Sequence, residues 1–557
     1  MILIFALIFS LSIANAKSDK TLDLLEKELN YNFEGLKKRE IAPYFISYSL
    51  TETKSLKIYS SFGKIILNSS DTKNTLDVSL RVGSYKLDNT HIIRGNAFEF
   101  GAGSYSPNLP LKINENAIRQ ATWLATDKAY KAATERFEKV QTNKAVKIAE
   151  EDTSADFSTE KPIVDIQDLI EFPQIDEKKL IEKLNEISSI FKNYGWIYSG
   201  MTFITVEFKN KYFISTEGTK LRWSEPYIRI MVNAETKAED GMTLPLYKDY
   251  FTYNFNELPS NDEIKKDVME MIDVLDKLRK APMMSTFSGP AILSGEAAGV
   301  FFHEIFGHRV EGHREKDPNS SQTFKQSIGK EILPDFINVT FDPTQKSRDG
   351  QAISGTYPYD DEGVKSHKVV AVEKGIFKGF LMSRIPIEGF PHSNGHGRRQ
   401  EGYSPVSRQS NLIVESSKSM PEAKLREDLI KLAKEQGRDF GLLFTKVQGG
   451  FTFTSRTIPN AFNVLPLVVY KVFVDDRPDE LVRGVDLIGT PLTTFENIVA
   501  TSDNIGIFNG VCGAESGGVP VSASSPSLLV KKIEVQKKQK SQSKLPILNA
   551  PTLQSID

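Results

Sequence analysis

Apolar residues recur at helical spacing in four stretches of the chain, with polar and charged residues on the opposite face of each. This periodicity is typical of amphipathic helices that cover an apolar surface. The four predicted helices span residues 21–36, 113–146, 176–194 and 262–278.

Between these helices lie shorter stretches rich in β-branched and aromatic residues, with partial alternation of apolar and polar positions. Such stretches predict strands. The predicted strands are residues 44–50, 56–67, 202–208, 212–216 and 227–232. The polar tripeptide Lys209-Asn210-Lys211 separates two of them and predicts a hairpin turn.

The pattern of residue types along the sequence changes after residue 280. The chain continues with short apolar stretches and frequent Gly, Pro, Ser and Thr, which indicates a largely antiparallel β domain. The 557 residues are too many for one ordinary core. We therefore predict an α+β protein with an N-terminal α+β domain at 17–280, a mainly β domain at 281–535 and a polar tail at 536–557. The acidic segment 150–162 is the expected linker.

The first residues have a different composition from the rest. Residues 2–13 are almost wholly apolar, and Ala14-Asn15-Ala16 provides small residues before an abruptly polar sequence. This pattern predicts a secretory signal peptide at residues 1–16, with an uncleaved short membrane anchor as the alternative. The mature chain is expected to be exported to the periplasm or the extracellular space and to contain no membrane span.

Composition narrows the function classes. Hydrophobic residues make up 39% and charged residues 25%, as in soluble globular proteins. The 70 basic and 72 acidic residues give a formal charge of −2. This balance argues against nucleic acid or anionic lipid as a partner, since either would favour a strong basic excess.

The strongest chemical signal is a pair of histidines next to a carboxylate. His303 and Glu304 end an apolar run, residues 297–302, that predicts a buried helix, and His308 follows. Neighbouring His and Glu with a second His nearby are typical of zinc hydrolases, in which imidazoles hold the ion and the carboxylate transfers protons.

The spacing between the histidines differs from the common zinc motif. They are five positions apart, which places them about 140° apart around a straight α-helix, against about 40° for a spacing of four. The helix must therefore widen or stop before His308. Gly307 is suited to this position because glycine adopts backbone angles that other residues avoid.

A catalytic zinc usually has three protein ligands, so one more is needed. Glu311 and His313 are the nearest candidates. Cys512 is the only cysteine, so no intramolecular disulfide can form, and its thiolate would bind zinc well. From the residues alone the third ligand stays open, and the further candidates are His367, His392, His396 and the acidic cluster 360–362.

Four segments resemble, in the same order, motifs of the TldD/PmbA family of zinc metallopeptidases. They are HEIFGHRVEG at 303–312, DDEG at 360–363, NGHGRR at 394–399, and the stretch 487–521 that contains Cys512. The resemblance covers about 281–535, and residues 20–280 are similar to the family only in general layout. It identifies the β domain at 281–535 as a metallopeptidase domain of the TldD type.

The resemblance implies one Zn²⁺ per chain, bound by His303, His308 and Cys512, with Glu304 as general base and acid. His392 and His396 are not needed in this pattern. The implied substrates are unfolded or extended peptides. A homodimer, or a heterodimer with a subunit of the same fold, is the implied assembly.

Three further residues are candidates for substrate binding: Asp361, Glu362 and Arg398. The ordinary interpretation of segment 360–362 is a solvated turn, and that of Arg398 is a surface charge. Two other functions compete with the peptidase. One is a non-catalytic zinc-binding scaffold subunit, and the other is an exported zinc amidase.

Overall fold

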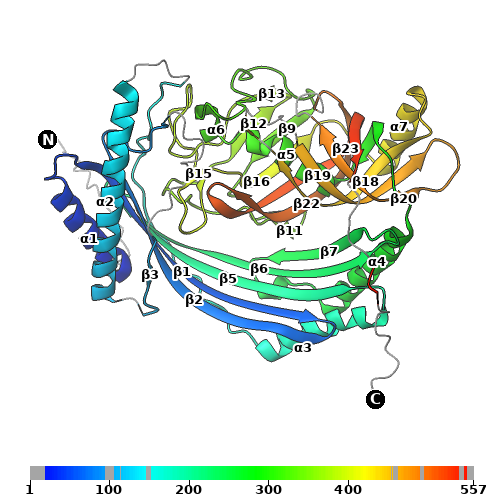
Figure 1. Ribbon diagram of the computed structural model, residues 1–557, viewed down its shortest axis with the longest axis horizontal. Coiled ribbons are helices and arrows are strands. Elements are labelled where there is room, and N and C mark those ends of the chain that lie inside the picture. Colours follow the sequence, from blue (N-terminus) through cyan, green and yellow to red (C-terminus); the bar gives the residue numbers. More distant parts are fainter. Residues whose placement is uncertain are drawn as a thin grey trace, which may run out of the picture.

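The computed structural model describes residues 19–93, 106–112, 114–145, 152–452, 454–455, 462–489, 495–538 and 545–547. The first half of the chain forms a long curved sheet, and the second half forms a β-rich layer that lies over the concave face of this sheet (Figure 1). The α+β class and the largely antiparallel C-terminal region are as predicted. The predicted signal peptide lies outside the described residues.

The N-terminal sheet contains seven strands in the order β3-β2-β1-β5-β6-β4, and β7 also pairs with β6. All of its pairings are antiparallel except that of β4 with β6. The strands are β1 (Pro43–Ser61), β2 (Lys64–Val82), β3 (Asn108–Leu109), β4 (Val164–Ile166), β5 (Ser199–Ser215), β6 (Lys220–Lys237) and β7 (Thr243–Thr252).

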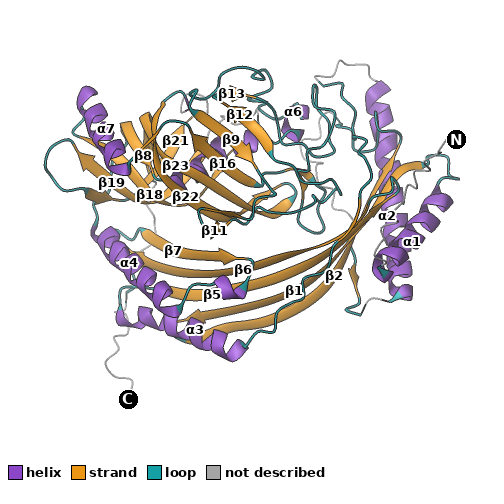
Figure 2. Ribbon diagram, turned by 180° about the vertical axis from the view of Figure 1, so that it is seen from behind, coloured by secondary structure: helices purple, strands orange, loops and turns teal. Residues whose placement is uncertain are grey.

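Helices in two pairs cover the outer face of this sheet, one pair near each end (Figures 1 and 2). They are α1 (Lys20–Leu36) with α2 (Glu115–Ala145), and α3 (Glu177–Ser189) with α4 (Asn261–Lys280); short 3₁₀ turns are η1 (Ile190–Asn193) and η2 (Phe255–Glu257). Each pair buries an apolar core against the strands. The four predicted helices are confirmed. Among the described residues, we find no helix with the length and apolar character needed to cross a membrane.

Two strand predictions were wrong. The polar residues at 51–55 lie inside the continuous strand β1, and the turn falls instead at Phe62-Gly63. Likewise, no turn forms at Lys209-Asn210-Lys211, because β5 runs straight through it. Lys209 binds Glu401 and Lys211 binds Asp361, both in the C-terminal layer. The two lysines in the middle of β5 therefore lie on the face that contacts the other layer.

The C-terminal layer is built on a sheet of twelve strands, β8, β9, β12, β13 and β16–β23. Its elements are β8 (Phe287–Leu293), α5 (Gly295–Ile305), η3 (Gly307–Arg309), α6 (His313–Lys316), β9 (Ile337–Phe341), β10 (Ser347–Arg348), β11 (Gln351–Ala352), β12 (Val369–Glu373), β13 (Ile376–Phe377), β14 (Gly397–Arg398), β15 (Val406–Ser407), β16 (Asn411–Ser416), β17 (Ser419–Met420), α7 (Glu422–Glu435), β18 (Phe440–Thr452), β19 (Phe462–Phe473), β20 (Glu480–Val482), β21 (Val485–Gly489), β22 (Ile498–Ala514) and β23 (Gly517–Lys537). Helix α7 was not predicted from the sequence.

Five strands of this sheet close into a ring, because β8 pairs with both β18 and β23 while β21 and β19 join the other two. Helix α5 packs against β18, β22 and β23, and every residue from Ala297 to Ile305 is buried. The main core of the C-terminal layer surrounds it. The apolar run before His303 is therefore a buried helix, as predicted.

Residues 152–160, within the expected linker, pack between the two layers. The Phe157 ring lies between two guanidinium groups, 3.8 Å from that of Arg81 and 3.9 Å from that of Arg384. Arg81 belongs to the N-terminal sheet and Arg384 to the C-terminal layer. The Arg384 guanidinium also donates to both carboxylate oxygens of Glu217 at 2.7 Å. This segment thus ties the layers together.

Candidate metal centre

His303, His308 and Cys512 meet at one buried position. One ligand atom from each of the three lies within 4.8 Å of the others, the spacing expected of groups that could share one ion. The Cys512 Sγ is 3.4 Å from His308 Nε2, and the two imidazole ring centres are 5.0 Å apart. Among the described residues, this is the one group of three such side chains that could hold a metal.

The unusual spacing of the histidines is accommodated by a change of helix type. The α-helix α5 ends at Ile305, and residues 307–309 continue as the 3₁₀ turn η3, which carries His308 back toward His303. The Arg309 guanidinium donates to the carbonyl oxygens of Glu304 and Ile305, at 2.8 and 3.0 Å. It thereby satisfies carbonyls that the end of the helix leaves open.

Gly307 permits this change through its size and not through its backbone angles. It is absent from the glycines with positive φ. A Cβ atom at Gly307 would lie 1.9 Å from Gln409 Oε1, which no real contact allows. The Gln409 side chain in turn donates to the His303 carbonyl oxygen at 3.2 Å. The predicted end of the helix was right, and the predicted reason was wrong.

The charges at the cluster favour the thiolate form of Cys512. Burial raises the pKa of the Cys512 thiol, but His308 and His303 together bring it well below its ordinary value. Burial lowers the pKa of His308, yet the neighbouring Cys512 and Glu311 raise it overall. The lowered pKa of Cys512 favours its thiolate, the form of cysteine that binds metal.

Glu304 lies beside the cluster with one oxygen unsatisfied. Its Oε2 is buried and accepts no hydrogen bond from the described residues. Its side chain packs against the backbone of Gly450, where a Cβ would come within 2.6 Å of the Glu304 Cγ. Burial raises the pKa of this carboxyl. An unpartnered carboxylate oxygen next to two imidazoles and a thiolate fits a metal centre with a bound water.

The two nearest alternative ligands lie outside the cluster. Glu311 is fully buried, and its Oε2 accepts hydrogen bonds from His308 Nδ1 at 3.2 Å and Arg314 Nε at 2.9 Å. Burial raises the pKa of Glu311, but His308 and Arg314 lower it overall to about 2. His313 instead binds Glu515. Glu311 therefore orients the His308 ring and leaves Nε2 directed at Cys512.

The acidic motif is a turn with buried carboxylates, so the solvated interpretation was wrong. Asp361 accepts from Lys211 at 2.9 Å and from the Arg399 backbone at 2.8 Å. Glu362 accepts from the Arg384 backbone at 2.6 Å, and burial raises its pKa to about 7. Asp360 is 1% exposed.

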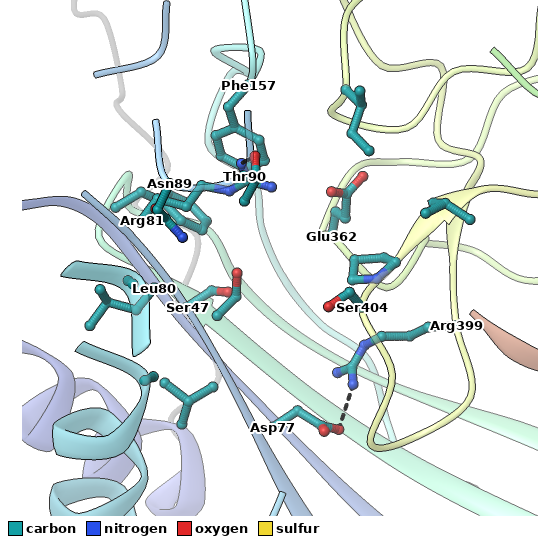
Figure 3. Close-up of a pocket in the computed structure, with 18 of the residues that line it drawn as sticks. Ser47, Asp77, Leu80, Arg81, Asn89, Thr90, Phe157, Glu362, Arg399 and Ser404 are labelled. Atoms are coloured by element: carbon teal, nitrogen blue, oxygen red, sulfur yellow. Dashed lines mark hydrogen bonds and ion pairs between the residues drawn. The ribbon is translucent and has the colours of Figure 1, made fainter. Parts of the chain in front are cut away.

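Asp361 and Glu362 face a cavity of about 450 Å³ between the layers, shown in Figure 3. Arg398 and Asp361 line a second cavity of about 610 Å³. Arg398 is not a surface charge: it donates to the Gln409 carbonyl at 2.6 Å and lies 4.4 Å from the Tyr357 ring centre. Among the lining residues described, neither cavity includes the metal cluster or Glu304.

The remaining histidine candidates also lie apart from the cluster. His367 and His392 are exposed, and His396 is buried with a hydrogen bond of 3.1 Å to Ser410. Sequence reasoning missed Arg408 and Gln409, both fully buried, which contact the segments that carry the cluster. No local pattern marks these two residues.

Fold and site together define a two-layer α+β protein with a buried His-His-Cys centre. Residues 286–537 match the PmbA/TldA metallopeptidase C-terminal domain. A solved structure, TldE from Thermococcus kodakarensis, has the same overall fold: the TM-score is 0.60 at 12% identity, covering 92% of this chain and 100% of that one.

Curated relatives carry metalloprotease names. A metalloprotease from Archaeoglobus fulgidus is 29% identical over 268 residues, 48% of this chain and 58% of that protein. A metalloprotease TldD homolog from Buchnera aphidicola is 26% identical over 345 residues, 58% and 64% of the two chains. A zinc metalloprotease TldD homolog from Saccharolobus solfataricus is 26% identical over 280 residues, 48% and 58%. The matched region thus spans about three fifths of these relatives.

Proposed function

We propose that this protein is a zinc-dependent metallopeptidase of the TldD/PmbA family. The observation that carries the proposal is the Glu304 carboxylate, buried and unpartnered beside the cluster of His303, His308 and Cys512. A purely structural zinc site needs no free carboxylate at its side. The C-terminal domain match and the names of the relatives support the same function.

The residues divide the work as follows. His303, His308 and the Cys512 thiolate would hold one zinc ion per chain. Bound zinc lowers the pKa of a coordinated water toward neutrality and polarises the peptide carbonyl. Glu304 accepts a proton from the attacking water and returns it to the leaving amine, a task suited to a carboxyl whose pKa is raised by burial. Glu311 holds His308 in the tautomer with Nε2 unprotonated.

Extended peptides are the substrates that the surroundings favour. Two apolar side chains are exposed next to site residues: Phe451, 45% exposed, follows the Gly450 that packs on Glu304, and Val511, 57% exposed, precedes Cys512. Exposed apolar groups one residue along the chain from Gly450 and Cys512 would suit peptide side chains, which an extended chain presents alternately. A roughly neutral protein is also suited to substrates of mixed charge.

Assembly and location are part of the proposal. The fold likeness to TldE supports a homodimer or a heterodimer with a subunit of the same fold. The apolar N-terminal segment supports export to the periplasm or the extracellular space. Asp361, Glu362 and Arg398 line the two cavities between the layers. They would affect substrate binding indirectly, by holding the walls of these cavities in place.

The test uses the full chain, native and in two variants. Zinc per chain and cleavage of an unstructured peptide are measured for native protein, Glu304→Gln and Cys512→Ser. Glu304→Gln should keep its zinc and lose activity at least about 100-fold, whereas Cys512→Ser should lose zinc and activity together. Glu373→Gln, with its side chain 60% exposed, is the matched control.

Chelation should abolish cleavage by the native protein, and added zinc should restore it. If zinc-loaded native protein cleaves nothing, alone or with a subunit of the same fold, the peptidase is excluded and the non-catalytic scaffold subunit takes its place. Cleavage of small amides without cleavage of peptides would favour an amidase.

A further inference from the structure

Two consecutive residues contact all three chain segments that carry the cluster. Arg408 and Gln409 lie between β15 and β16, and both are 0% exposed. Arg408 Nη2 donates to the Cys512 carbonyl oxygen at 2.6 Å. Gln409 Nε2 donates to the His303 carbonyl oxygen at 3.2 Å, and its amide fills the space above Gly307.

The other atoms of the Arg408 guanidinium extend this contact in two directions. Nη1 donates to Ser516 Oγ at 2.7 Å and to the Gly517 carbonyl at 3.0 Å, in the turn that joins β22 to β23. Nε lies 3.5 Å from Glu311 Oε1, and the other oxygen of Glu311 accepts from His308 Nδ1. One rigid group therefore touches the backbone of one cluster residue and the carboxylate that orients another.

The geometry of the cluster needs such a connection. Cys512 follows His308 by 204 residues, so chain continuity does nothing to fix the distance between their side chains. Metal–ligand distances must hold to within about 0.2 Å. A planar guanidinium with donors at fixed angles transmits position better than a flexible ammonium. A buried arginine is also costly unless it is well paired, which argues for a specific role at this place.

We propose that Arg408 is a positioning residue that sets the distance from Cys512 to His308, so that the metal centre is assembled before an ion binds. The proposal rests on the proposed function only for the identity of the centre, not for its catalysis. Gln409 supports the same arrangement from the His303 side. Arg398 holds the pair in place through the Gln409 carbonyl.

The experiment titrates metal-free full-length protein with Co²⁺ and follows the thiolate-to-cobalt charge-transfer absorption. The variants are Arg408→Lys and the milder Ser516→Ala, which removes one partner of Arg408. Arg384→Lys is the control, because it also removes a buried guanidinium but contacts none of the cluster residues. Circular dichroism and thermal melting report on folding.

We expect folded Arg408→Lys to bind Co²⁺ about 10- to 100-fold more weakly, the usual effect of losing an outer-shell contact, and with a weaker charge-transfer band. Ser516→Ala should weaken binding at least about twofold, and Arg384→Lys should bind as native protein does. The proposal would be overturned if a folded Arg408→Lys or Ser516→Ala protein bound Co²⁺ with the affinity and the band intensity of native protein. Absence of Co²⁺ binding by native protein would instead refute the proposed metal centre.

Discussion

Replacement of Gly307 by alanine tests how the structure solves the unusual histidine spacing. The added Cβ would lie 1.9 Å from Gln409 Oε1 and 2.2 Å from its Cδ, whereas ordinary contacts begin at 3.4 Å. Gln409 is 0% exposed, so its side chain cannot swing into solvent. Either its amide moves and breaks its hydrogen bond to His303, or the turn η3 moves and carries His308 with it.

The expected loss of stability follows from these two possible movements. Overpacking of a filled interior costs about 1–3 kcal/mol, and loss of one hydrogen bond adds about 1 kcal/mol. Gly307→Ala should therefore lower the free energy of unfolding by about 2–4 kcal/mol and weaken zinc binding by at least about tenfold. Urea titration of metal-free protein measures the first quantity, and competition with a chromophoric chelator measures the second.

A double mutant isolates the cause. If the clash with Gln409 is the origin, Gly307→Ala with Gln409→Ala should be more stable than the sum of the single changes by at least about 1 kcal/mol. Gly35→Ala is the control, because no atom lies within 4 Å of its added Cβ. A Gly307→Ala protein with native stability and zinc affinity, or a double mutant without coupling, would refute the steric account.

Three further outcomes are expected. Burial raises the pKa of Glu362 from 4.5 to about 7, so the folded state binds its proton more tightly and stability should fall as pH rises through this interval; melting temperatures at pH 5 and pH 8 should differ less in Glu362→Gln. Phe157→Ala should lower the free energy of unfolding, measured by urea titration, by about 3 kcal/mol. Trp123→Ala should lower it by far less, because the Trp123 side chain is 51% exposed. Val511→Asp should raise KM for an apolar peptide with kcat little changed, since the side chain is exposed, adjoins Cys512 in the sequence and is not one of the proposed metal ligands; an unchanged KM would remove Val511 from the substrate surface.

The four helices that cover the N-terminal sheet could be predicted from the sequence because each has an apolar stripe against one neighbour. The strands of the N-terminal sheet were harder to predict, because one face of the sheet packs against helices and the other packs against a charged layer. On that second face, Lys209 and Lys211 bind carboxylates that lie 150 or more residues further along the chain. A charged residue in a strand then resembles a turn until its partner is known.

The candidate site likewise contains residues that the sequence reveals and residues that it does not. His303, Glu304 and His308 form a local pattern whose chemistry is visible in the sequence. Cys512 was a candidate from the residues alone, but several other ligands stayed open and only the family resemblance selected it. Arg408 and Gln409 lie more than 100 residues from the cluster residues that they contact, and no spacing rule links them. Their role follows from packing between distant segments, which one sequence does not encode visibly.

The distribution of unsatisfied polar atoms indicates what this part of the fold is built for. Glu304 Oε2 and Gln409 Oε1 are buried without a hydrogen-bond partner among the described residues, while Glu311 Oε1 and Arg408 Nε make no hydrogen bond but face each other as an ion pair at 3.5 Å. Each buried atom without a partner costs about 1–3 kcal/mol in a protein interior, and stability alone would select against two of them near one point. Their concentration around the cluster is therefore explained by positioning: Arg408 and Gln409 are placed for the carbonyls that they hold, and Glu304 is kept free for a water that only a metal-bound state would supply.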